Sequence, residues 1–154
     1  MNGHSRTTSR TRRHPDSRPT APHYDPPVPR NPRNPRRLKV GDDTYIWTLT
    51  HDHEPKIPRT CRNVLKLRHH EATGRLILVF QEAPGRIVTG AHTPSGYVAT
   101  EEAHLNLHRP GAVRALLDEA LARGWNPVTA TTREQDGWPL LAPAATRLAD
   151  IRTR

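Results

Sequence analysis

The chain of 154 residues contains one cysteine, few aromatic side chains and no long apolar run. A single cysteine, Cys61, excludes an internal disulfide, which fits a reducing compartment. No stretch approaches the ~20 apolar residues that a membrane-spanning helix needs. No apolar segment follows Arg12 and Arg13, as one would in a secretory signal. We therefore expect a soluble cytoplasmic protein that makes no membrane contact.

Motifs of the common enzyme classes are also missing. The sequence has no GxSxG elbow, no P-loop and no GxGxxG fingerprint. Glu101 and Glu102 are adjacent in the chain, and Glu119 falls on the outer face of a predicted helix. No two carboxylates therefore share one buried face, as tuned acid–base catalysis requires. We expect no enzymatic activity, no catalytic residue and no cofactor.

The N-terminal segment 1–36 has much positive charge and almost nothing to bury. It holds eight of the sixteen prolines and eight arginines, against Asp16 and Asp25. Such a segment cannot offset the conformational entropy lost on ordering, so we expect a disordered tail. Residues 37–152 have the composition of one small domain with a single core.

Phosphate binding is one interpretation of this tail, because arginine neutralises phosphates without reading bases. The side chains that would contact nucleic acid are those of Arg10, Arg12, Arg13, Arg30, Arg33 and Arg36. Proline, threonine, serine and histidine dilute the charge, however. We favour the alternative, a tail that has no role or is not translated.

The clearest structural signal is an amphipathic helix over residues 110–125. Pro110 suits the first helical position, and Gly124 can take the left-handed conformation that ends a helix. Apolar residues recur with helical spacing along one stripe, at Val113, Leu116, Leu117, Ala120 and Leu121. Such a helix needs a sheet to pack against.

Alternating apolar and polar residues predict strands ahead of this helix. The predicted strands are 37–40, 44–50, 62–69, 75–80 and 86–89, with shorter ones near 97–99 and 104–107. After the helix we predict a last strand at 128–132, a turn at 135–137 and a marginal helix at 144–151. This order is typical of the α+β class, here an antiparallel sheet of about four to five strands packed on one helix. The expected core beneath the helix comprises Trp47, Leu49, Leu65, Leu67, Leu78 and Phe80.

Three candidate metal ligands flank the predicted loop 51–61. His51 and His53 follow the second strand and Cys61 precedes the third, so a hairpin could bring them to one zinc ion. Zinc motifs usually pair two ligand clusters, and only one is present here. We therefore favour a polar loop facing water and predict no metal site, with these three residues as the candidates if one exists.

Trp138 is the aromatic side chain that we expect to be exposed, because it lies between Gly137 and Pro139 in a predicted turn region. An exposed tryptophan indicates a contact surface for a protein partner. Tyr45 and Trp47 could stack bases, but they share a strand face with Leu49 and fit the core better.

Residues 37–127 resemble a group of small bacterial α+β proteins. In that group a hairpin with the pattern Y-x-W, here Tyr45 to Trp47, precedes one helix that ends A-L-x-x-G-W-x-P, here Ala120 to Pro127. The resemblance implies the fold, and it implies no activity and no site residues. We expect a non-catalytic interaction domain with a protein partner. The alternative is a nucleic-acid-associated protein that binds through the arginine-rich tail.

Overall fold

The computed structural model describes residues 34–53, 60–89 and 96–153. Its larger sheet has the strand order β1-β2-β3-β4-β8, formed by β1 (Arg36–Val40), β2 (Asp43–His53), β3 (Cys61–His69), β4 (Arg75–Gln81) and β8 (Thr132–Asp136). A smaller sheet consists of β5 (Ile87–Val88), β6 (Tyr97–Ala99) and β7 (His104–Asn106). The two helices are α1 (Pro110–Ala122) and α2 (Trp138–Thr153). The predicted α+β class is confirmed, with a second sheet and a longer second helix than expected.

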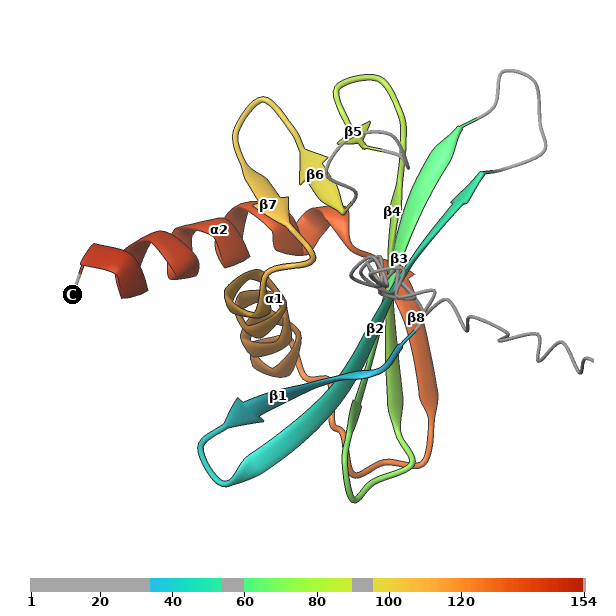
Figure 1. Cartoon of the computed structure of the whole chain (residues 1–154), viewed down its shortest axis with the longest axis vertical. Helices are drawn as coiled ribbons and strands as arrows, with labels where there is room; N and C mark the ends of the chain where they lie inside the picture. The colour runs from blue at the N-terminus through green and yellow to red at the C-terminus, as the bar shows by residue number, and fades with distance from the viewer. Residues whose placement is uncertain (1–33, 54–59, 90–95, 154) are drawn as a thin grey trace, which may run out of the picture.

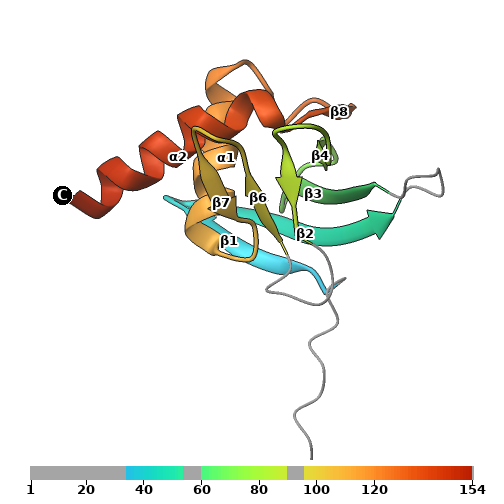
Figure 2. The ribbon, with the colours of Figure 1, turned by 90° about the horizontal axis from the view of Figure 1, so that it is seen from above.

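Both helices and the smaller sheet lie on one side of the larger sheet (Figures 1 and 2). Trp47 and Leu67 are cross-strand partners, as are Leu49 and Leu65, and all four are buried on this side. Leu78 and Phe80 of β4 continue the same layer and are fully buried. The predicted core is therefore confirmed, and the opposite face of the sheet carries the intervening side chains, which are both polar and apolar.

Helix α1 begins at the predicted Pro110 and ends at Ala122, three residues before the predicted end of the segment. Pro110 occupies its first turn, Gly124 has a φ of +91°, and the backbone N–H of Trp125 donates to the carbonyl of Ala120 at 3.0 Å. Glu119 is the exception, because it was expected on the outer face and is only 8% exposed. Its carboxylate accepts hydrogen bonds from Arg123 and from Arg147 of α2. That expectation was wrong, since the outer face of α1 at this point is covered by α2.

Helix α2 begins six residues before the predicted 144–151 segment. Asp136 Oδ1 accepts the backbone N–H of Trp138 at 3.1 Å, as a helix cap does. Pro143 lies inside the helix and has no N–H to donate to the carbonyl of Pro139. Arg123 Nη2 donates to that carbonyl at 3.1 Å. The side chain of Arg123, which caps the C-terminus of α1, thus satisfies the acceptor that proline leaves open.

Strand β8 was misplaced by the sequence analysis. The predicted strand 128–132 and turn at 135–137 are wrong, because the strand runs from Thr132 to Asp136. It pairs in parallel with β4, so that Gln135 lies beside Leu78, while the other four strands of this sheet are antiparallel. An edge strand made of polar residues has no apolar alternation by which to recognise it.

The Trp138 side chain is 6% exposed, so the expected exposure is wrong. Its Nε1 donates to the carbonyl of Gln81 at 2.9 Å, and its ring packs edge-on against Phe80 at 5.4 Å. The partner-binding role proposed for Trp138 rested on exposure and loses its basis.

Of the predicted nucleic-acid contacts, Arg10, Arg12, Arg13, Arg30 and Arg33 lie outside the described residues. Arg36 lies in β1, where its guanidinium stacks on the Trp47 ring at 4.4 Å and donates to the carbonyl of His108 at 2.8 Å. These contacts give Arg36 a structural role at the sheet edge. Within the described ranges, no helix is long and apolar enough to cross a bilayer.

Candidate metal centre

Strands β2 and β3 extend further than predicted, and their joined ends carry the candidate ligands. His53 pairs with Cys61, and His51 pairs with Asn63. The expectation that these side chains belong to a loop is therefore wrong, although His53 is exposed to solvent as expected. Of the predicted loop 51–61, residues 54–59 lie outside the described residues. Since alternate residues share a face, all four side chains lie on the helix-covered side, directly beyond Leu49 and Leu65.

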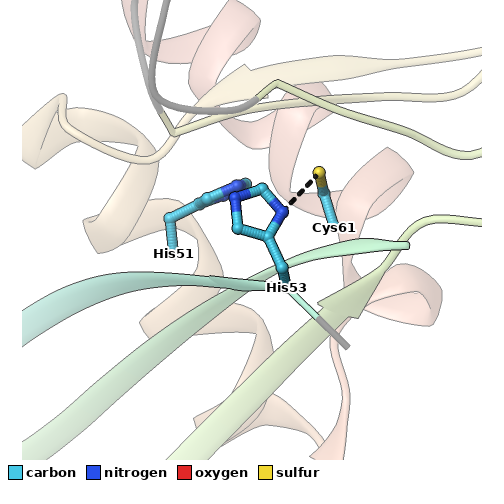
Figure 3. A group of neighbouring side chains, drawn as sticks. All are labelled: His51, His53 and Cys61. Atoms are coloured by element: carbon cyan, nitrogen blue, oxygen red, sulfur yellow. Dashed lines mark hydrogen bonds between the residues drawn. The ribbon is translucent and has the colours of Figure 1, made fainter. Parts of the chain in front are cut away.

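The three candidate ligands converge. One ligand atom from each of His51, His53 and Cys61 lies within 4.8 Å of the other two. Cys61 Sγ and His53 Nδ1 are 3.3 Å apart, and the two imidazole rings meet edge to face at 4.9 Å (Figure 3). In a tetrahedral zinc site, Zn–N and Zn–S bonds of about 2.0–2.3 Å separate the ligand atoms by about 3.3–3.6 Å. The Cys61–His53 pair already has this spacing, and the 4.8 Å limit on the three ligand atoms is only about 1 Å above it.

Asn63 orients the His51 ring and selects the tautomer of its neutral form. Its Oδ1 lies 2.8 Å from His51 Nδ1. An amide oxygen only accepts, so in this assignment Nδ1 donates, and in the neutral ring Nε2 has a lone pair for a metal ion. This Nε2 is buried and has no hydrogen-bond partner among the described residues. A partner that orients one imidazole nitrogen while the other is left open is the usual support of a metal-bound histidine.

Burial raises the pKa of the Cys61 thiol, and the nearby Glu82 carboxylate raises this pKa further. Without a metal the thiol is protonated at neutral pH, and it can donate to His53 Nδ1. A bound cation would displace that proton. Glu82 Oε2 accepts the backbone N–H of Cys61 at 3.0 Å, which places a negative charge beside the cluster. The cluster therefore combines imidazole and thiol ligands with a nearby negative charge that favours a cation.

The site is open on one side, because His53 is exposed while His51 and Cys61 are half-buried. Three protein ligands leave a fourth position of a tetrahedral ion for water or another ligand. Among the residues that the structure describes, these three form the one group of at least three potential ligands.

Sequence reasoning missed Asn63 and Glu82. Each lies one strand period, two residues, from a recognised core residue. Asn63 precedes Leu65 by two positions, and Glu82 follows Phe80 by two. Period-two counting beyond the apolar stretch would have placed both side chains on the inner face.

The other polar groups noted in the sequence do not join this site. His69 lies at the opposite end of β3, where its Nε2 pairs with Asp43 at 3.1 Å. Glu101 and Glu102 are exposed between β6 and β7. Comparison with protein-family models, with curated proteins and with solved structures finds no match for the chain. The site must therefore be interpreted from its own chemistry.

Proposed function

We propose that this protein binds one zinc ion through His51, His53 and Cys61. The observation that supports this most strongly is the unpartnered, buried Nε2 of His51, next to two further soft ligands. Two imidazoles and a thiolate form a ligand set that suits zinc. A bound ion would also satisfy the one polar atom of His51 that the fold leaves without a partner.

The zinc ion would link the ends of β2 and β3 on either side of the loop that connects them. Its ligands come from the last register pair of the two strands and from His51, two residues earlier. Glu82 is engaged with the Cys61 backbone, so it is not placed to act as a general base on a zinc-bound water. We infer that the metal is non-catalytic and stabilises the fold. The proposed role of the protein remains that of the interaction domain expected from the sequence.

The test is metal analysis of the untagged full-length chain, since a histidine tag would bind zinc itself. We expect one zinc per chain after dialysis, and a gain in thermal stability on zinc addition. At a free zinc concentration 100 times the Kd, the stabilisation is about 2.7 kcal/mol. For a domain of this size it corresponds to a rise in Tm on the order of 10 °C.

Substitution separates the proposed ligands from other histidines. Cys61→Ser and His53→Ala should each abolish stoichiometric zinc. His70→Ala is the matched control, because His70 is an exposed histidine at the far end of β3. Zinc below one ion per chain in the unmodified protein, or equal loss in the His70→Ala control, would contradict the proposal.

A further inference from the structure

The face of the larger sheet opposite the helices carries a cluster of positive side chains. Leu65, Leu67 and Leu76 face the core, so Lys66 and Arg68 of β3 and Arg75 of β4 face outward. Neither helix, and no strand of the smaller sheet, lies on that side in Figure 1 or Figure 2. We call Lys66, Arg68 and Arg75 the basic cluster.

The register places like charges against each other within this cluster. Arg68 is the cross-strand partner of Arg75, and Lys66 is the partner of the adjoining Ile77. Side chains opposite each other in this way have Cβ atoms about 4.5–5.5 Å apart, and like charges there are destabilising. An anion bound between the two guanidinium groups would remove that repulsion.

No carboxylate neutralises the basic cluster within the described ranges. Arg68 donates only to the backbone carbonyl of His70, at 3.4 Å. Glu134 of β8 lies beside Ile77 in the ladder and forms no ion pair with any of the three cations. By contrast, Arg62 on the same face is paired with Asp52 at 3.5 Å. On this stretch of the sheet, three neighbouring cations thus have no carboxylate partner among the described residues.

The basic cluster borders a groove of about 390 Å³. Half-buried Ile46 and Ile77 contribute its apolar part and Thr48 a hydroxyl group. Such a groove suits a ligand whose anionic groups reach the cations while the C–H edges of its sugar rings lie against the isoleucines, as phosphate and sugar can in a nucleic acid strand. Tyr45 and Trp47 are buried towards the core, so base stacking is not expected. Contact would be with the backbone and independent of sequence.

We propose that the basic cluster and its groove bind the sugar–phosphate backbone of a single nucleic acid strand. The chain has a net charge of +9, which attracts polyanions at long range. Pro35, near the end of the basic N-terminal segment, itself lines the groove. Paired guanidinium groups match phosphate geometry, and a strand offers phosphates in a continuous row. This surface lies on the opposite face of the sheet from the zinc ligands and does not depend on them.

The test measures anisotropy of a fluorescein-labelled single-stranded RNA of mixed sequence with the full chain, at several salt concentrations. In Arg68→Gln/Arg75→Gln, loss of two phosphate contacts should lower the slope of log K against log salt by about 1.4. We expect affinity at low salt to fall at least about tenfold. Removing the like-charge pair should leave thermal unfolding unchanged or slightly improved, which verifies the fold of the variant.

The matched control, Arg109→Gln/Arg152→Gln, removes the same charge from exposed positions on the helix side. It should bind within about threefold of the unmodified chain, since only long-range attraction is reduced. Equal losses in the two double variants, or no loss in Arg68→Gln/Arg75→Gln, would overturn the proposal. Displacement of the RNA by polyglutamate at matched charge would also overturn it, and would indicate an acidic protein partner instead.

Discussion

Replacing Asn63 by leucine should separate the stability of the fold from its affinity for zinc. Asn63 is fully buried; its Oδ1 accepts from His51, while its Nδ2 has no partner among the described residues. Leucine leaves the His51 Nδ1 donor unpaired, which should cost about 1–3 kcal/mol of unfolding free energy. The substitution also removes a buried unpaired amide N–H and adds buried apolar surface. These two changes stabilise the fold by an amount similar to the cost of the unpaired donor. We expect the unfolding free energy of the metal-free protein to change by no more than about 1 kcal/mol.

Zinc affinity should respond much more strongly to the same substitution. Loss of the partner that orients a metal-bound histidine lowers affinity about 10–100-fold, which is about 1.4–2.7 kcal/mol. Asn63→Asp keeps an acceptor for His51 Nδ1 and should bind zinc at least as tightly as the unmodified chain. Competition with a chromophoric chelator measures the affinities, and urea unfolding of the metal-free proteins measures stability. A folded Asn63→Leu variant with zinc affinity within twofold of the original would refute this reasoning.

Three further predictions concern the fold. Hydrogen bonds from Arg123 and Arg147 lower the pKa of Glu119, so Glu119→Gln should cost roughly 1–3 kcal/mol at pH 7. The pKa of Glu119 is lower in the folded than in the unfolded protein, so the stability difference between Glu119→Gln and the unmodified chain should shrink as pH falls below about 4.3, where the unfolded carboxyl is protonated. Urea unfolding of the two proteins at pH 7 and below about pH 4.3 measures this difference. A difference that stays constant with pH would contradict the assignment. Leu117 is fully buried, and Leu117→Ala should cost about 2–5 kcal/mol by the same assay, with a loss below 1 counting against the core assignment. A Cβ on Gly137 would meet the Phe80 ring at 2.5 Å. Gly137→Ala should therefore lower Tm measurably, and an unchanged Tm would be inconsistent with this packing.

Local patterns were sufficient for the elements whose buried faces are apolar. The stripe around Leu116 and Leu117 marked α1, and the alternation in 75–80 marked β4. Strand β8 could not be found this way, because its residues are polar and its strand conformation comes from pairing with β4. The start of α2 had a local signal, Asp136 followed by Pro139, but Gly137 suggested a turn there.

The three residues of the candidate site were named from the sequence, but the sequence did not show that strands β2 and β3 bring them together. His51 and His53 interrupt the apolar alternation, so the predicted strand ended at residue 50. In the structure the β2–β3 ladder continues to the His53–Cys61 pair. Strand length and register, which depend on pairing between distant residues, bring the ligands together. The supporting role of Asn63 follows from the same register and could not be assigned without it.

X-ray absorption at the zinc edge of the untagged full-length protein tests the central claim most directly. The proposal predicts one sulfur at about 2.3 Å and two imidazole nitrogens at about 2.0–2.1 Å, with the sulfur lost in Cys61→Ser. A shell made only of oxygen ligands, or one in which the sulfur is absent from the unmodified chain, would contradict it.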